Sequence, residues 1–460
     1  MVSKEILEEV LARALSTGAD FAEIFVENTS QKSISMVDSK VDSLKDQQIA
    51  GVGVRVFKGT RSVYGSCSGI DKSKMLLCAA RVADALEGAD GKQDIYLRER
   101  LFGDRHPIRV VPAGVRNEEK INYLKEAYFT AKNYHQDICQ VEGMFLDVDH
   151  KILIANSEGL LAQDRQVRTR MLINAVAGRD GETQTGRTAY GARLGMELLE
   201  KFPPKRYGEE AAEQALTMLS AGYIEGGVMP VAIESGFGGV IFHEACGHSL
   251  EACAIAKGQS QFCGKMEQKI ANEKLTAVDD GTIQNAWGSI NIDDEGTPAR
   301  RNVLIENGVL KSYMTDRLNG MRLGIPSTGN CRRQSYEFEP TSRMTNTFIV
   351  NGNDSNEDII KSIEYGLYAK SMGGGSVNPI TGNFNFAVVE GYVIRNGKIC
   401  EPVRGASLIG KGSDILMDID MIGQNLDRGQ GMWRIQRKCS DRRRPAFAQG
   451  QQNNGGRPIN

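Results

Sequence analysis

The stretch Gly51-Val-Gly-Val-Arg-Val-Phe57 places a valine at every second position. Alternate side chains of a β-strand point to opposite faces, so this period of two predicts a strand with one apolar face. Outward from it, we predict strands at Phe21–Val26, Ser33–Val37 and Ser62–Ser68 and amphipathic helices at residues 3–17 and 72–87. The order helix, antiparallel strands, helix is typical of an α+β fold.

The rest of the chain continues this mixed pattern and becomes richer in strands. We predict helices at residues 117–135, 208–220 and 356–365, and strands around 140–156 and 165–178. Asn307-Gly308 and Asn396-Gly397 each separate two apolar runs, which is the pattern of hairpins with type I′ turns. The length predicts two domains, or one domain with a large insertion. We expect an N-terminal α+β domain with an antiparallel sheet in residues 1–205 and a β-rich C-terminal domain in residues 225–432.

Composition narrows the possible functions. A net charge of −2 gives no reason to expect nucleic acid or an anionic membrane as a partner. The chain contains no apolar run of 18 residues, so we expect no membrane-spanning helix. The acidic, amphipathic N-terminus does not resemble a signal peptide, and the nine scattered cysteines favour a reducing cytoplasm.

The most informative motif for function is His243-Glu-Ala-Cys-Gly-His248, which holds two of the five histidines in the chain. Two imidazoles beside a carboxylate can hold a divalent metal and supply a base for a water molecule. The alternative is a buried helix with two hydrogen-bonded, inert histidines. Cys246 and Cys253 lie next to these histidines, and we interpret each as a buried apolar thiol rather than a ligand.

The histidines are five residues apart, which places them about 140° from alignment on a regular α-helix. One π-type turn inserts an extra residue and restores the alignment, and such turns often mark functional sites. Gly247 lowers the free energy needed to leave α geometry. We therefore predict a distorted helix between His243 and His248.

A glycine run at Gly373-Gly-Gly375 lacks the Lys-Ser or Lys-Thr that follows a phosphate-binding loop. We interpret it as a flexible or ligand-approaching loop.

Several segments together resemble the TldD/PmbA family of metalloproteases, and its TldD branch in particular. The resemblance runs from about residue 19 to residue 431. Its motifs, in the family's order, are Gly51-Val-Gly-Val-Arg55, Gly239-Val-Ile-Phe-His-Glu-Ala-Cys-Gly-His-Ser-Leu-Glu251, Val278-Asp-Asp-Gly-Thr282, Asn291-Ile-Asp-Asp-Glu-Gly-Thr-Pro298, Ser327-Thr-Gly-Asn330, Arg343-Met-Thr-Asn346, Gly373-Gly-Gly375 and Phe386-Ala-Val-Val-Glu-Gly-Tyr392.

The resemblance implies a two-domain subunit whose β-rich C-terminal domain carries a metal-binding helix. It implies a homodimer, or a heterodimer with a related subunit, that encloses its active sites and acts on short or unfolded peptides. It makes His243 and His248 ligands of Zn²⁺ and Glu244 the general base. Five acids could support the site, or could instead form turns on the solvated surface: Asp279, Asp280, Asp293, Asp294 and Glu295.

The C-terminal end departs from the family pattern. The family has a third ligand, a cysteine in a Cys-Gly-Lys segment, about where Trp433 stands here. Residues 433–460 contain seven basic residues and one acid, without strand periodicity, and are expected to be disordered. If suitable codons encode Gln436 to Phe447, translation of the same nucleotides in the neighbouring reading frame gives a segment that resembles the missing one. We therefore hypothesise a frameshift near the end of the gene. Cys439 is an alternative third ligand.

The sequence thus predicts a zinc-dependent metallopeptidase, impaired if no group replaces the missing cysteine. The alternatives are a non-catalytic partner subunit of a TldD/PmbA-type complex and a peptide-binding module that captures extended chains at open sheet edges.

Overall fold

The computed structural model describes residues 2–86, 94–378, 380–428, 433–434, 437–439 and 447–448. It confirms the α+β class with antiparallel sheets. The first part of the chain forms α1 (Lys4–Ala14), β1 (Phe21–Val37), β2 (Lys40–Lys58), β3 (Arg61–Ser68), α2 (Lys72–Asp84), β4 (Arg98–Glu99), α3 (Asn117–Lys132), β5 (Ile138–Asn156), β6 (Leu160–Arg179), β7 (Glu182–Ala192), α4 (Leu198–Lys201) and α5 (Pro204–Leu219).

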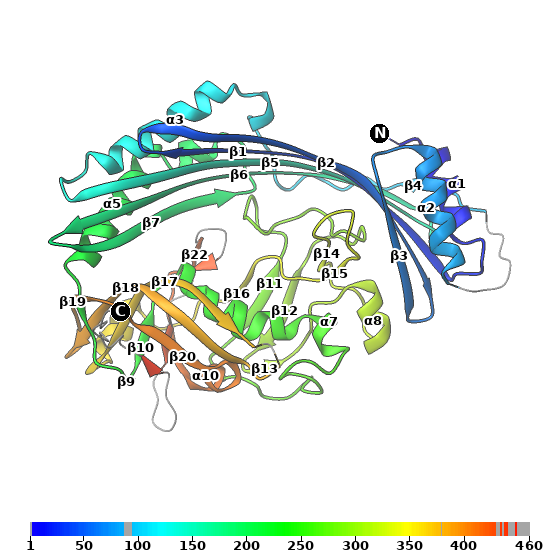
Figure 1. The fold of residues 1–460 in the computed structure, drawn as a ribbon. Coiled ribbons are helices and arrows are strands. Elements are labelled where there is room, and N and C mark those ends of the chain that lie inside the picture. The colour runs from blue at the N-terminus through cyan, green and yellow to red at the C-terminus, as the bar shows by residue number, and fades with distance from the viewer. Residues whose placement is uncertain are drawn as a thin grey trace, which may run out of the picture.

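These strands build one seven-stranded sheet in the order β3-β2-β1-β5-β6-β4, with β7 also paired to β6. The sheet arches over the rest of the molecule, as Figure 1 shows. Strands β1, β2, β5 and β6 are each 17 to 20 residues long. At about 3.3 Å per residue, such strands span roughly 60 Å.

The two faces of this arch have different partners, because side chains alternate along each strand. In β1, even-numbered residues such as Ile24 and Ile34 pack in cores with the helices, whereas Phe25 packs with Ile292 and Tyr336 of the C-terminal part. Helices α1 and α2 cover one end of the convex face, and α3 and α5 cover the other (Figure 1).

The opening stretch follows the same rule. Val52, Val54 and Val56 belong to the core under α1 and α2. Gly51 faces the opposite way, where a Cβ atom would lie 2.3 Å from the Tyr336 ring. The glycine is therefore needed for the C-terminal part to approach the sheet.

Two separate strands predicted at Phe21–Val26 and Ser33–Val37 are in fact one strand, and this prediction was wrong. The intervening residues 27–32 are polar, which made them look like a break. They continue the strand because β1 pairs through them with β2 and β5 on both sides.

The second part of the chain adds a ten-stranded sheet and a four-stranded sheet beneath the arch. Its strands are β8 (Gly222–Tyr223), β9 (Gly227–Val228), β10 (Val231–Ile233), β11 (Ala277–Asp280), β12 (Arg301–Glu306), β13 (Val309–Leu310), β14 (Cys331–Arg332), β15 (Thr341–Ser342), β16 (Thr347–Ile349), β17 (Tyr365–Val377), β18 (Asn383–Arg395), β19 (Lys398–Arg404), β20 (Ser407–Lys411), β21 (Ile419–Ile422), β22 (Asp427–Arg428), β23 (Trp433–Arg434), β24 (Arg437–Cys439) and β25 (Phe447–Ala448). Its helices include α6 (Val240–Phe242), α7 (Ala252–Ile255), α8 (Arg317–Leu323), α9 (Asn356–Lys361) and α10 (Gly412–Asp418).

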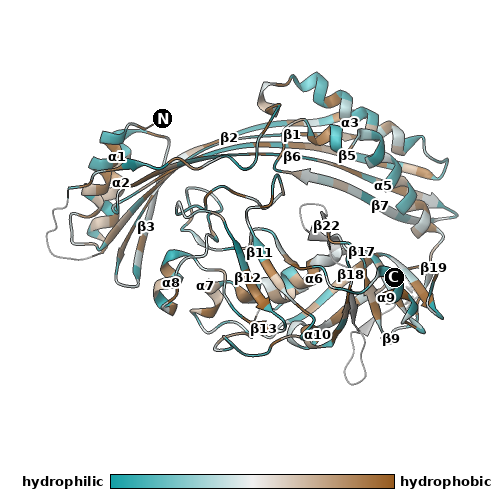
Figure 2. Cartoon of the chain, turned by 180° about the vertical axis from the view of Figure 1, so that it is seen from behind, coloured by the Kyte–Doolittle hydropathy of each residue, from teal (hydrophilic) through white to brown (hydrophobic). Residues whose placement is uncertain are grey.

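Both predicted Asn-Gly hairpins are confirmed. Asn307 and Gly308 have φ of 47° and 82°, and Asn396 and Gly397 have φ of 49° and 72°. Two consecutive positive φ values are what a type I′ turn requires. Hydrophobic residues gather along the strands below the arch, such as β11 and β12, and form the largest core of the described chain (Figure 2).

The predicted loop at Gly373–Gly375 is instead part of β17, so this prediction was wrong. A Cβ atom on Gly375 would lie 2.1 Å from the backbone oxygen of Asn385 in the neighbouring β18. The glycines allow a closely packed, irregular strand pair rather than a loop.

The predicted division into residues 1–205 and 225–432 stays a prediction, although α5 packs with the first sheet and the second sheet begins at β8. Most of the tail predicted to be disordered, residues 433–460, lies outside the described residues. In the parts of the chain that the structure describes, no helix is long and apolar enough to span a bilayer.

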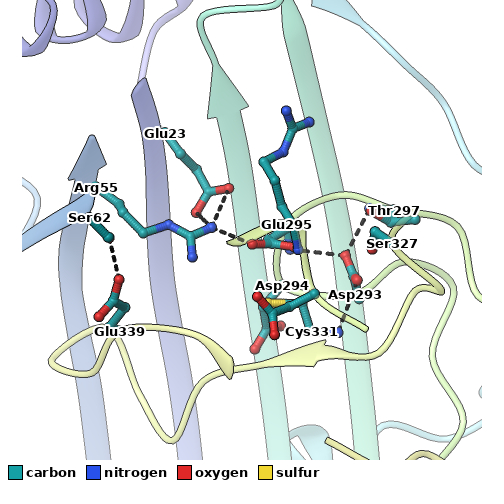
Figure 3. Close-up of polar contacts among 12 residues, drawn as sticks. Glu23, Arg55, Ser62, Asp293, Asp294, Glu295, Thr297, Ser327, Cys331 and Glu339 are labelled. Carbon is teal, nitrogen blue, oxygen red and sulfur yellow. Dashed lines mark hydrogen bonds and ion pairs between the residues drawn. The ribbon is translucent and has the colours of Figure 1, made fainter. Parts of the chain in front are cut away.

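A buried ion network joins the arch to the C-terminal part (Figure 3). Arg55 on β2 is 0% exposed, and its Nη2 donates to Glu23 Oε1 of β1 at 3.1 Å and to Glu295 of the C-terminal part. Arg333 also donates to Glu23. Burial alone would lower the pKa of Arg55, but Glu23 and Glu295 hold it above its usual value. Arg55 therefore stays charged between two carboxylates.

Replacing this cation should destabilise the fold strongly. The variant Arg55→Met leaves Glu23 and Glu295 buried with fewer partners, and breaking a buried pair from one side typically costs about 3–5 kcal/mol. We expect the free energy of unfolding, measured by urea denaturation at neutral pH, to fall by that order. Arg109→Met, which breaks an exposed pair with Glu200, is the control and should barely move the midpoint. Equal midpoints for both variants would contradict the assigned role of Arg55.

Candidate metal centre

The His-Glu motif lies in a short irregular helix beneath the arch. After α6, residues His243–Gly247 form a π-helical segment, η3, and His248–Leu250 form a 3₁₀ turn, η4. The apolar residues Val240, Ile241 and Phe242 just before the motif are buried and anchor the segment in the core. The predicted distorted helix between His243 and His248 is confirmed.

This π segment brings three potential ligands together. The ring centroids of His243 and His248 lie 5.0 Å apart at an interplanar angle of 85°. His248 Nε2 lies 3.6 Å from Glu244 Oε2. One ligand atom from each of His243, Glu244 and His248 falls within 4.8 Å of the others. The arrangement fits a small divalent cation.

The orientation of His248 is fixed by a second carboxylate. His248 Nδ1 lies 3.0 Å from Glu251 Oε1, and Arg343 Nη1 donates to Glu251 Oε2 at 2.7 Å. Since a carboxylate accepts, we assign the proton to Nδ1, which leaves Nε2 free to face Glu244. A ligand histidine in a metal site is commonly held by a carboxylate in this manner.

His243 is suited to binding a cation because it is uncharged. Burial, together with the nearby His248 and Arg332, lowers its pKa to about 3. A neutral imidazole is the form that coordinates a metal. His243 is therefore in its ligand form throughout the physiological pH range.

Neighbouring residues hold the π segment in shape. Gln261 Nε2 donates to the backbone oxygen of Ala245 at 2.9 Å. Gly412, at the start of α10, packs so closely that a Cβ atom would lie 2.4 Å from the same oxygen. Cys246 is 2% exposed, as expected for a buried thiol, whereas Cys253 is only half-buried. Irregular backbone is thus supported on several sides.

A cavity of about 590 Å³ opens in front of the two histidines, between the arch and the C-terminal part. The arch contributes Glu27, Thr29 and Gln31 of β1, together with residues of β5 and β6. Sequence analysis missed these residues. They occupy alternate positions of β1, so their period of two was the pattern that could have identified a strand with a polar face.

The five acids predicted either to support the site or to form solvated turns are all buried, so the solvated-surface alternative was wrong. Asp293 does hold a turn, because its Oδ1 accepts from the N–H groups of Glu295 and Thr297. Asp279 is bound by Thr345, Thr347 and Asn330. Of the five, Asp294 lines the cavity, and burial raises its pKa to about 6.

The donor set fits a metal but is incomplete in the described chain. Within the described residues, His243, Glu244 and His248 are the one group of three or more metal-binding side chains. Two neutral imidazoles and a carboxylate suit a borderline divalent cation. The side chain of the alternative ligand Cys439 lies outside the described part of the structure, so a third protein ligand stays a prediction.

Comparison with protein-family models gives three consecutive matches. Residues 22–89 match the PmbA/TldA metallopeptidase domain 1, residues 111–219 match the central domain and residues 226–442 match the C-terminal domain. The third match extends beyond Met432, where the motif-by-motif resemblance ends. Its limit at residue 442 includes part of the unusual tail.

Curated relatives are similar along almost the whole chain. A metalloprotease TldD homolog of Buchnera aphidicola is 33% identical over 93% of this chain and 89% of its own length. A metalloprotease TldD homolog of Haemophilus influenzae is 34% identical over 90% and 88%.

Solved structures agree in fold. TldE from Thermococcus kodakarensis superposes with a TM-score of 0.79 at 19% identity, covering 97% of this chain and all of that one. A proposed modulator of DNA gyrase from Thermotoga maritima gives a TM-score of 0.80 at 21% identity over 97% and 99%. At these identities the likeness concerns the fold alone. The family models and the curated relatives together show that the chain belongs to the PmbA/TldD family of metallopeptidases.

Proposed function

We propose that the protein is a zinc-dependent metallopeptidase that cleaves short or unfolded peptides, with His243 and His248 as ligands and Glu244 as general base. The observation that carries this proposal is the π segment, which places ligand atoms of all three side chains within 4.8 Å of one another. Two of the three, His243 and His248, line the cavity. In the alternative of a buried helix with two inert histidines, nothing would require both histidine side chains to lie close to the same carboxylate. The names of the curated relatives, metalloprotease TldD homologs, support the same activity.

Zn²⁺, when bound, supplies a Lewis acid that makes a water molecule nucleophilic near neutral pH. Glu244 is half-buried beside His248 and takes the proton from the attacking water at a carboxylate oxygen. The same carboxyl group then delivers that proton to the leaving amine. Glu251 keeps His248 in one orientation throughout, because it accepts from Nδ1 and is itself held by Arg343.

The dimensions of the cavity support a short or unfolded substrate. A volume of about 590 Å³ lies in the range of roughly 300–1,000 Å³ that is typical of sites for small ligands. A few residues of extended chain fit such a space, but a folded domain does not. The proposed setting is the cytoplasm, with the chain in a homodimer or in a heterodimer with a related subunit.

Two other functions remain as alternatives. A non-catalytic partner subunit needs no base, yet this chain has Glu244 positioned beside both histidines. A peptide-binding module would use the cavity or an open sheet edge without turnover. Metal content and the effect of replacing Glu244 separate these alternatives from a peptidase.

The substitution Glu244→Gln tests catalysis directly. Loss of a general base typically lowers turnover by about 10²–10⁴-fold, whereas zinc held mainly by the histidines should remain. We expect kcat on a quenched fluorescent peptide, measured in the chain with its tail from Trp433 restored to the neighbouring frame, to fall by that factor, with zinc content unchanged by elemental analysis. Glu267→Gln, at an exposed acid paired with Lys311, is the matched control and should leave both quantities unchanged. Unchanged turnover in Glu244→Gln would remove Glu244 from the mechanism.

Zinc stoichiometry tests the missing third ligand. Catalytic zinc sites normally use three protein ligands, so two histidines alone should bind weakly. We expect about one zinc per chain only when the tail from Trp433 is restored to the neighbouring frame, and much less for the chain as it stands. Zinc near one in both proteins would show that Cys439 or another group completes the site.

A further inference from the structure

The cavity in front of the histidines contains more positive than negative side chains. Its lining includes four arginines and three acids, which are Arg168, Arg332, Arg333, Arg343, Glu27, Glu251 and Asp294. Charges enclosed in a protein are unfavourable unless they are paired. A charged side chain that forms no ion pair within the protein is available to a ligand of opposite charge, so we consider the partners of each arginine and each acid in turn.

Two of the arginines are already neutralised. Arg343 pairs with Glu251 at 2.7 Å, and that acid also holds His248. Arg333 pairs with Glu23 at the junction with the arch. The charge of each of these two guanidinium groups is therefore balanced by a carboxylate of the protein, and neither is available for a ligand.

The two remaining acids are held by neutral donors. Glu27 accepts from Thr29 Oγ1 and from the N–H of Tyr336, each at 2.7 Å. Asp294 accepts from the N–H of Arg333 at 2.6 Å. Both acids already have donors, and neither forms an ion pair with Arg168 or Arg332 among the described residues.

Arg168 and Arg332 therefore lack a carboxylate partner within 4.0 Å in the described part of the chain. Arg168 lies on β6 of the arch, and its Nε donates only to the backbone oxygen of Trp287 at 2.9 Å. Arg332 lies on β14, on the opposite wall of the cavity, where it is exposed, whereas Arg168 is half-buried. The two side chains approach the site from different parts of the molecule.

Their charges act on each other and on the metal motif. Burial, together with the nearby Arg193 and Arg332, lowers the pKa of Arg168 to about 10. Burial and then Arg343 lower the pKa of Arg332, which in turn contributes to the lowered pKa of His243. Arg332 is thus near both Arg168 and the histidine that we propose as a ligand.

We propose that Arg168 and Arg332 form a carboxylate-binding subsite next to His243, which selects peptides that carry a carboxylate close to the bond to be cleaved. A guanidinium presents donors in a planar fork that matches a carboxylate. Asp294 acts on both guanidinium groups from a distance without forming an ion pair with either of them. A substrate carboxylate between the two walls supplies the direct partner that both arginines lack. This inference names a substrate class for the proposed peptidase and rests on that function.

The carboxylate can come from two sources. One is the α-carboxylate at the C-terminus of a short peptide, and the other is an aspartate or glutamate side chain within a longer one. Both present the same group to the arginines, so peptides that differ only in these groups distinguish them.

The test measures peptide binding in the full chain carrying Glu244→Gln, so that turnover does not interfere. Three labelled peptides of equal length are compared by fluorescence anisotropy: a free C-terminal acid, its amide, and an amide with one internal glutamate. We expect one carboxylate-bearing peptide to bind about tenfold more tightly than the plain amide, because charged hydrogen bonds are strong. A chelator-treated sample in parallel separates the arginines from any bound metal.

Arg332→Gln and Arg168→Gln, each added to Glu244→Gln, should abolish this preference while leaving affinity for the amide within about twofold. Arg187→Gln, at an exposed arginine on β7, removes the same charge away from the cavity and should retain the preference. Equal affinity for acid and amide, a preference that survives both substitutions, or no binding of any peptide would overturn the subsite. Zinc content and cleavage of the plain amide are measured separately, in the protein that retains Glu244. These two measurements test the proposed peptidase activity independently of the carboxylate-binding subsite.

Discussion

The structure depends on one electrostatic constraint, which is that a charge removed from water must be paired. Arg55 meets this constraint through Glu23 of the arch and Glu295 of the C-terminal part, and Arg333 adds a second cation on Glu23. These four residues can neutralise one another only when the arch lies against the C-terminal part. The cavity is the space between those two parts, so the ion pairs beside it fix the positions of its walls. Polar side chains from strands of the arch line the cavity opposite the motif His243–His248.

The same constraint separates structural charges from functional ones. Glu251 is bound on both sides, by His248 and by Arg343, and so fixes the proposed ligand His248 without a part in the proposed reaction. Glu244 is half-buried, next to the histidines, and is in a position to move a proton. The acids Asp279 and Asp293 are saturated by donors from neighbouring loops and shape the backbone. Burial, partners and access thus assign different roles to carboxylates that look alike in the sequence.

Features encoded by neighbouring residues could be predicted from the sequence. The five-residue spacing from His243 to His248 required a π-type turn, and each Asn-Gly pair required a type I′ turn. Features that depend on distant segments could not be predicted. The polar middle of β1 looked like a break because its partners, β2 and β5, are separate in sequence. The cavity residues Arg168 and Arg332 belong to different sheets, and no local pattern relates them.

Because β1, β5 and β6 are so long, each strand contributes to several separate regions of the molecule. All of these contacts depend on which face of the sheet each side chain points to. A single strand contacts α1 and α2 at one end, the cavity in its middle and α3 and α5 at the other end. Inserting or deleting one residue near the first end would turn every later side chain to the opposite face, so that Glu27 and Thr29 would face away from the cavity. An extra residue is therefore tolerated near the end of such a strand, as at the register shifts beside Ser35 of β1 and between Ile138 and Gln140 of β5, but not beside the cavity.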